Sequence, residues 1–211
     1  MRTPAIDAAL VRALSTPRLG RYLADSGGIL DAALSLYERN ARISEAFHRP
    51  LQGLEVCLRN HLNDRLAARY GTHWYRTTAA PLTPATIEKL DKAMNDLQRS
   101  RLPINQGSVV AELNFGFWVT LLSRPYARSL WPPTFSGIFH EGGRRMSWQT
   151  VHRRMNELRD FRNRVAHHEP IYHLNPAQVH ADIIQATAWI CPDTAAWILE
   201  HSQVPRVLAT P

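Results

Sequence analysis

Cysteine and long apolar runs are scarce in this sequence, and each scarcity excludes a class of protein. Only Cys57 and Cys191 are present, too few for a disulfide framework, and their apolar neighbours predict small buried side chains. No apolar stretch reaches the length of a membrane span, and the first residues lack the apolar core of a secretory signal. We therefore expect a cytoplasmic protein that does not contact the membrane.

Motifs for metal binding, nucleotide binding and nucleophilic hydrolysis are missing as well. The ten histidines include no H-E-x-x-H and the cysteines no C-x-x-C, so we expect no metal and no cofactor. Gly137 and Gly142 have the spacing of a phosphate loop, but Arg144 follows Gly143 where Lys-Ser/Thr is required. Because G-x-S-x-G is absent we do not expect a serine hydrolase, and we do not expect a cysteine hydrolase either.

Lysine is almost absent, and arginine supplies nearly all of the positive charge. Lys89 and Lys92 are the only lysines, and the formal net charge is +7. Guanidinium groups bind phosphate bidentately, so one interpretation is a polyanionic partner such as RNA. The other is that arginine-rich codon usage has placed charge on solvated helix faces. Charge alone does not choose between them.

Proline and glycine divide the sequence into segments of helical periodicity, which predicts an all-α fold. We expect a short N-terminal helical cap over 1–28, a helical domain over 29–202 and a fraying tail over 203–211. Pro50 predicts the end of one helix and the start of another, an αα-hairpin. The second of these helices would face inward through a leucine stripe: Leu51, Leu54, Leu58, Leu62 and Leu66.

Later segments complete the predicted bundle. The helix that Thr83 caps should turn Ile87, Leu90, Met94 and Leu97 inward. The most apolar helix, over 107–122, should lie at the centre of an up-and-down bundle. Ser147 caps a further helix that ends near His168, because Pro170 biases its predecessor away from helical geometry.

The end of that helix gathers the side chains that carry chemistry. Arg162, Asn163, His167, His168 and Glu169 lie within eight positions. Asn163 and His167 fall one turn apart on the same side, whereas Arg162 lies about 140° round the axis from His167. Arg162 and His167 can converge only if the last turn loosens or if a second copy of the chain supplies one of them.

These residue types suit the cleavage of RNA. A 2′-hydroxyl must lose a proton to attack the adjacent phosphorus, and the leaving 5′-oxygen must gain one. Histidine titrates near neutrality and can do either, and a guanidinium stabilises charge on the phosphate oxygens. No metal is needed. The opposing interpretation is structural, since arginine and histidine near a helix C-terminus interact favourably with the helix dipole.

Three segments in order carry a resemblance to a known family. R-N-R-V-A-H-H-E-P at 162–170 resembles the R-x4–6-H motif of the HEPN superfamily, in the form found in its Abi-like, abortive-infection branch. L-E-V-C-L-R-N-H-L at 54–62 and E-L-N-F-G-F-W at 112–118 also fit that branch, so the resemblance spans roughly residues 30–175. The chain is shorter than many Abi-like proteins.

The resemblance implies a function and roles for residues. It implies an all-α, HEPN-like homodimer whose two motifs face each other, and a metal-independent endoribonuclease of phage defence or toxin-like growth arrest, with a possible antitoxin. Arg162, Asn163 and His167 would be catalytic, with His168 as the alternative imidazole. Glu55 and Arg59 would either support this site or form an intrahelical ion pair.

We also expect other arginines to contact RNA, and we keep a second function open. We expect RNA contacts from Arg164, Arg144 and Arg145. The alternative function is a non-catalytic RNA- or partner-binding module of a defence system.

Overall fold

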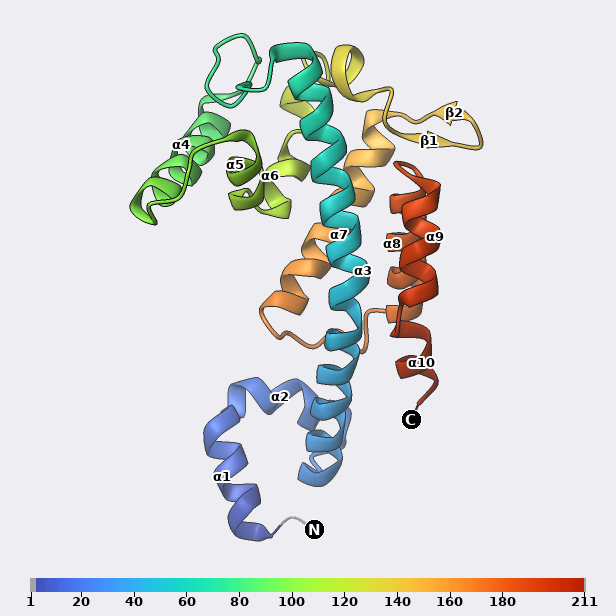
Figure 1. Cartoon of the computed structure of the whole chain (residues 1–211). Coiled ribbons are helices and arrows are strands. Elements are labelled where there is room, and N and C mark those ends of the chain that lie inside the picture. Colours follow the sequence, from blue (N-terminus) through green and yellow to red (C-terminus); the bar gives the residue numbers. More distant parts are fainter. Residues whose placement is uncertain (1–2, 211) are drawn as a thin grey trace.

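The protein is all-α apart from one small hairpin, as the sequence predicts. A computed structural model describes residues 3–210 (Figure 1). The helices are α1 (Pro4–Leu14), α2 (Thr16–Asp25), α3 (Leu30–Tyr70), α4 (Pro84–Arg99), α5 (Gln106–Glu112), α6 (Phe115–Thr120), α7 (Trp148–Ala166), α8 (Pro176–Ala188), α9 (Pro192–His201) and α10 (Val204–Ala209). The antiparallel hairpin pairs β1 (His140–Glu141) with β2 (Arg144–Arg145).

One long helix organises the molecule, and the predicted break at Pro50 is wrong. α3 is continuous over 41 residues, about 60 Å of helix. A proline inside a helix costs about 3 kcal/mol because it removes one backbone hydrogen bond and crowds the preceding turn. Here Phe47, Pro50, Leu51 and Leu54 are all buried on α3, so apolar burial on both sides of the proline offsets that cost.

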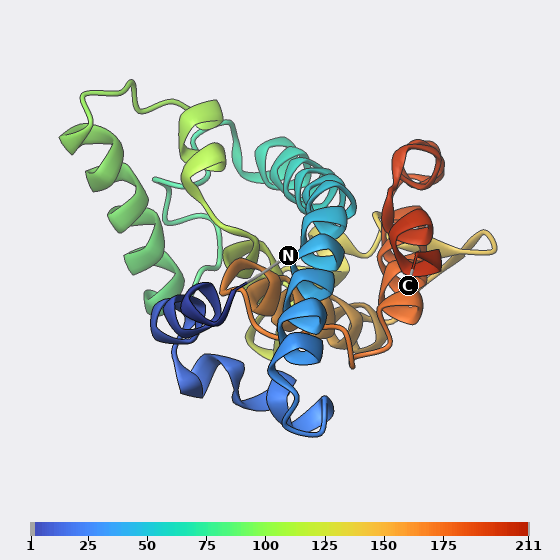
Figure 2. The same cartoon turned by 90° about the horizontal axis from the view of Figure 1, so that it is seen from below.

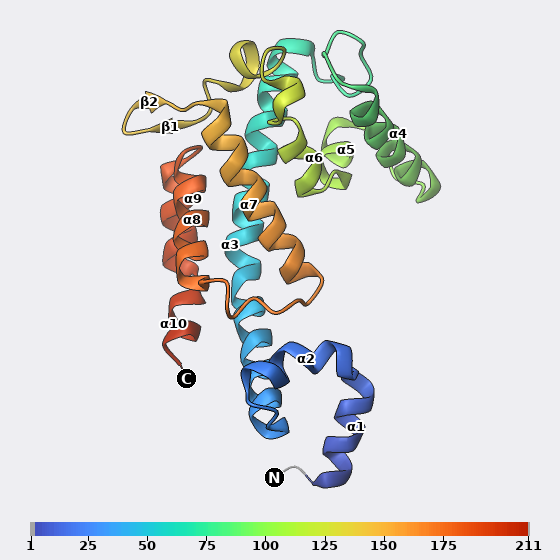
Figure 3. The same cartoon turned by 180° about the vertical axis from the view of Figure 1, so that it is seen from behind.

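The other helices divide into groups around α3. Figure 2 shows α4, α5 and α6 on one side of α3 and α8, α9 and α10 on the other. α7 crosses α3 between these groups (Figure 3). The predicted leucine stripe is confirmed, because all five of its side chains are buried: Leu51, Leu54, Leu58, Leu62 and Leu66.

The N-terminal helix pair packs beside the N-terminal end of α3. α2 buries Leu19 and Tyr22, whereas α1 buries no residue. Gly27 and Gly28 adopt positive φ angles of 62° and 79°, and this turn leads into α3. Both short helices therefore form where the sequence predicts them.

The predicted apolar helix over 107–122 is wrong in its continuity. It is interrupted between α5 and α6, where the Asn114 side chain accepts a hydrogen bond from the backbone N–H of Phe117 at 3.0 Å. An asparagine at this position competes with helical backbone bonding and starts a new helix instead. Both pieces contribute buried residues to the core.

Two smaller expectations also differ from the structure. Ile87 of α4 is 45% exposed, because buried Thr86 takes the inward position and its Oγ1 bonds the Tyr126 hydroxyl at 2.6 Å. Residues 204–209 form α10 with Val204 buried, so this part of the tail does not fray.

Cys57 is buried as expected, and Cys191 is only partly covered. No helix within residues 3–210 is both long and apolar enough to cross a membrane.

Candidate functional site

The motif helix α7 is fixed to the core through one apolar face. The Ser147 hydroxyl accepts a hydrogen bond from the N–H of Thr150 at 3.2 Å and so starts the helix. Phe161 packs edge-on against Phe47 of α3, with ring centroids 4.8 Å apart. The buried side chains recur at helical spacing: Val151, Met155, Leu158, Phe161 and Val165. The polar residues beside this stripe are thereby held at the rims of the α3–α7 contact.

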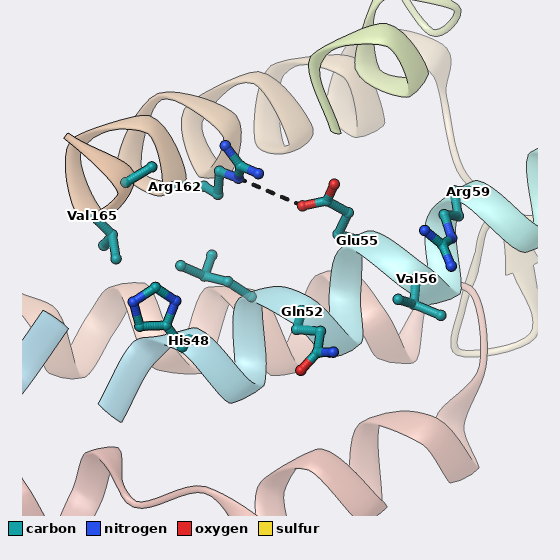
Figure 4. Close-up of a pocket in the computed structure, with 9 residues that line it drawn as sticks. His48, Gln52, Glu55, Val56, Arg59, Arg162 and Val165 are labelled. Carbon is teal, nitrogen blue, oxygen red and sulfur yellow. Dashed lines mark ion pairs between the residues drawn. The ribbon is translucent and has the colours of Figure 1, made fainter. Parts of the chain in front are cut away.

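A groove between α3 and the C-terminal half of α7 contains Arg162. Its volume is about 440 Å³, and Figure 4 shows Arg162 of α7 and Glu55 of α3 reaching toward each other across it. The Nε of Arg162 lies 3.5 Å from Oε2 of Glu55, and the two side chains are 35% and 20% exposed. Arg59, one turn beyond Glu55 on α3, lines the same groove. Glu55 thus pairs with Arg162 on α7, and no Glu55–Arg59 ion pair is found among residues 3–210.

This ion pair leaves the outer edge of the Arg162 guanidinium available. Glu55 contacts Nε, and among residues 3–210 neither Nη atom of Arg162 has a hydrogen-bond partner. Two parallel N–H groups match two oxygens of a phosphate. The groove thus presents an oriented guanidinium and a second arginine, Arg59, which is the chemistry that binds a phosphodiester.

Asn163 faces a different groove from its neighbour Arg162. That second groove, about 620 Å³, lies among α4, α5, α6 and α7, and Asn163 and Arg159 line it together with Lys89 and Lys92. Adjacent helical residues point about 100° apart, and here that separation places Arg162 and Asn163 in the linings of different grooves. Within one chain, the structure does not bring Asn163 to Arg162's groove.

The two motif histidines lie at the turn that ends α7. The backbone N–H of His167 bonds the Asn163 carbonyl at 2.9 Å, and the carbonyl of His167 accepts from Nη2 of Arg18 on α2 at 3.3 Å. His168 adopts a left-handed backbone with φ of 57°, which ends the helix. The His167 side chain is exposed and lines none of the grooves described here. Arg162 and His167 of one chain are therefore not brought together.

His168 reaches a third, smaller groove of about 230 Å³, farther toward the N-terminal end of α3. Tyr37, Glu45 and His168 line it together with His48 and Val165. His48 and Val165 also line the groove that contains Arg162, so the two hollows adjoin along the α3–α7 contact. His48 was not singled out from the sequence. Its spacing to Glu55 and Arg59, seven and eleven positions, was the signal that could have identified it.

Asn40 holds the loop after the motif, a role that no sequence pattern indicated. Asn40 is 4% exposed, and its Oδ1 accepts from the N–H groups of Ile171 and Tyr172 at 2.7 and 3.2 Å. Its Nδ2 donates to the carbonyl of Glu169 at 3.2 Å. The Tyr172 hydroxyl donates to Asp25 of α2, and burial together with this hydrogen bond raises the pKa of Tyr172. The turn carrying the histidines is thus anchored to both α3 and α2.

The predicted RNA-binding arginines lie in separate places. Nη1 of Arg164 pairs with Oε2 of Glu169 at 3.0 Å, so its charge is partly balanced within the chain. Arg144 and Arg145 are exposed on β2, in the hairpin near the start of α7 (Figure 1). The hairpin lies at the opposite end of α7 from the histidine turn.

Metal-ligating side chains are not grouped in the part of the chain that the structure describes. Over residues 3–210, no three His, Cys, Asp or Glu side chains are grouped so that they could hold a metal ion. No known family, curated protein or solved structure matches this chain. The candidate site is the groove between α3 and α7 that Arg162 and Arg59 line. His48 lines it as well, and His168 lies in the adjoining groove.

Proposed function

We propose that this chain is a metal-independent endoribonuclease, the activity that its resemblance to the Abi-like branch of the HEPN superfamily implies. One observation carries the proposal. Arg162 pairs with Glu55 through its Nε, its Nη atoms have no hydrogen-bond partner among residues 3–210, and Arg59 lines the same groove. An oriented guanidinium binds the scissile phosphate and stabilises the charge that develops on its oxygens.

The motif's imidazole would come from a second copy of the chain. In one chain His167 lies outside Arg162's groove, but its side chain and those of Ala166 and His168 are exposed at the end of α7. A two-fold contact through α7 would bring the exposed turn of one copy toward the groove of the other. Asn163, exposed on α7, would then lie at the contact and orient the partner's imidazole or the phosphate.

The biological setting follows from the same resemblance. We infer a cytoplasmic role in phage defence, abortive infection or toxin-like growth arrest, in which cleavage of RNA stops growth and an antitoxin restrains the enzyme. Expression of the wild-type chain should then be toxic, and Arg162→Ala should relieve the toxicity.

Cleavage of single-stranded RNA in the presence of EDTA tests the activity. The wild-type chain should give products with 2′,3′-cyclic phosphate and 5′-hydroxyl ends. Arg162→Ala and His167→Ala should each lower the rate by roughly 10²–10⁴-fold, the range for groups that transfer protons or stabilise charge. Cleavage by both variants at the wild-type rate would remove the motif from the mechanism.

A second function, a non-catalytic RNA- or partner-binding module, is favoured by one observation. Within a single chain the groove of Arg162 contains neither Asn163 nor His167. A binding module would still hold RNA through Arg144, Arg145 and Arg162, and its affinity would fall steeply with salt. Intact RNA at every enzyme concentration, combined with salt-dependent binding, would select this function over the nuclease.

A further inference from the structure

His48 is the histidine that shares Arg162's groove within the same chain. It lies on α3, its side chain is exposed, and it lines the groove together with Glu55, Arg59 and Arg162. In Figure 4 its ring stands on the face of α3 that is turned toward the end of α7, beside Val165. Within the described part of the chain, the imidazole of His48 has no hydrogen-bond partner, so both ring nitrogens are available to a ligand.

The spacing along α3 places three chemical groups in one row. His48, Glu55 and Arg59 are separated by seven and then four positions, so they lie within about 40° of one another around the helix. His48 and Glu55 stand two turns apart, about 10 Å along the axis. The groove of about 440 Å³ is within the size range of pockets that hold small ligands, about 300–1,000 Å³. One ribose with its 3′-phosphate can therefore lie between Arg162 and His48.

We propose that His48 is the general base of the Arg162 groove, acting on the 2′-hydroxyl of single-stranded RNA. This proposal rests on the ribonuclease function proposed above and deepens it. Cleavage needs a base for the 2′-hydroxyl and an acid for the 5′-oxygen on opposite sides of the phosphorus. His48 supplies the base from the same chain as Arg162, and His167 of a second copy supplies the acid.

The reaction is a transesterification that consumes no water. His48 takes the proton of the 2′-hydroxyl, and the 2′-oxygen forms a bond to phosphorus. The bond from phosphorus to the 5′-oxygen breaks, and that oxygen takes a proton from the His167 imidazolium. The products are a 2′,3′-cyclic phosphate and a 5′-hydroxyl. The two imidazoles then exchange protons with solvent and return to their starting states.

The charged surroundings of His48 come from both helices. The titratable and charged side chains that line its two adjoining grooves are Tyr37, Glu45, Glu55, Arg59, Arg162 and His168. Two carboxylates on α3 flank His48, one on either side along the helix axis, whereas the arginines gather at the Glu55 end. The phosphate therefore lies at the arginine end, and the ribose points toward His48.

Rate and binding measurements on the full chain test this role. His48→Ala and His48→Gln should lower cleavage of single-stranded RNA by roughly 10²-fold or more. The same variants should still bind an all-2′-deoxy oligonucleotide, which cannot be cleaved, within about threefold of wild type, because Arg162 and Arg59 dominate phosphate contact. His61→Ala, on another face of α3, is the matched control and should cleave as wild type does.

Mixtures of inactive variants test whether the groups share a chain. If Arg162 and His48 act in one chain and His167 acts from the other, His48→Ala mixed with His167→Ala recovers about a quarter of the wild-type rate. Random pairing makes half of the dimers mixed, and each mixed dimer keeps one intact site of two. His48→Ala mixed with Arg162→Ala should recover nothing.

Three outcomes would overturn the role of His48, and they are distinguishable. Wild-type cleavage by both His48 variants leaves the nuclease standing and removes His48. Recovery by the His48→Ala and Arg162→Ala mixture places His48 in the partner's site. A wild-type chain that binds the oligonucleotide but never cleaves RNA overturns the nuclease itself, and the proton-transfer role falls with it.

Discussion

Glu55 on α3 contacts Arg162 on α7, with Oε2 and Nε 3.5 Å apart across the groove (Figure 4). Both side chains keep access to solvent, so this pair contributes only about 0–1 kcal/mol to stability. Its consequence is geometric, because it keeps the Arg162 side chain beside Glu55 in the lining of the groove. Arg162 is thereby placed by a residue more than a hundred positions earlier in the chain.

Removing the Glu55 carboxylate should therefore affect activity more than stability. Glu55→Ala should lower RNA cleavage by roughly 10–100-fold, since small misplacements of a phosphate-binding group have effects of that order. The free energy of unfolding should change by less than about 1 kcal/mol. Glu55→Gln keeps an acceptor for Nε and should recover part of the rate. The control is Glu157→Ala, which removes the ion pairs of Glu157 with Arg153 and Arg154 within α7 and should leave cleavage unchanged. Equal activity of Glu55→Ala and wild type would show that Arg162 does not depend on Glu55.

Asn40 should be required for the stability of the loop after α7. Asn40→Ala leaves the N–H groups of Ile171 and Tyr172 and the carbonyl of Glu169 without their partner. Each buried group that loses its hydrogen bond costs about 1–3 kcal/mol, so we expect a loss of roughly 3 kcal/mol in urea denaturation. Asn60→Ala, at an exposed position of α3, should change the free energy of unfolding by less than about 0.5 kcal/mol. A similar small change for Asn40→Ala would contradict the anchoring role.

Gly53 is the position at which α9 approaches α3 closely. A Cβ at this glycine would lie 2.7 Å from Cγ1 of Ile198, whose side chain is fully buried. Gly53→Ala should destabilise the protein by roughly 1–3 kcal/mol, the usual effect of overpacking. Gly20→Ala on α2 is the matched control, because no atom lies within 4 Å of its added Cβ. That control should stabilise the helix by roughly 0.5–1 kcal/mol. Thermal unfolding of both variants checks the contrast, and a stabilised Gly53→Ala would disprove the close contact.

His180 should make the protein less stable in mild acid. It is 7% exposed, packs near Phe47, and its burial lowers its pKa in the folded state. Below the ordinary histidine pKa of about 6.5, the unfolded chain therefore binds more protons than the folded chain. Stability is complete above that pH and falls as pH decreases through it toward the lower folded-state pKa. In urea titrations at pH 7 and pH 5, the free energy of unfolding of His180→Gln should decrease less on acidification than that of wild type. An equal decrease in both proteins would show that His180 does not cause the acid sensitivity.

The sequence identified several elements for local reasons. A capping side chain marks the start of α7, where Ser147 caps the helix as predicted. Helical period alone identified the inward leucine stripe of α3, including Leu58 and Leu62. The same period placed Arg162 about 140° round the helix from His167, and the structure shows His167 outside the groove that Arg162 lines. These features depend on residues within one or two turns of each other.

The errors occurred where distant packing outweighed local preference. Pro50 favours a break, but the buried residues on both sides of it keep α3 whole. Ile87 is apolar, yet Thr86 takes the inward position through its bond to Tyr126, forty residues away. His48 was missed because its spacing to Glu55 and Arg59 points to a shared site only once α7 is known to cross α3 beside them.

Helical periodicity and the Pro, Ser and Asn punctuation determined that this protein is all-α, and the motif's composition determined its basic and imidazole chemistry. Only the tertiary structure decided which of those side chains meet. A helix fixes the directions of its own residues, but the partner across a groove depends on how two helices cross. That crossing is set by the buried Phe47–Phe161 contact and its neighbours, and it places Arg162 with Glu55 and His48 and apart from Asn163 and His167.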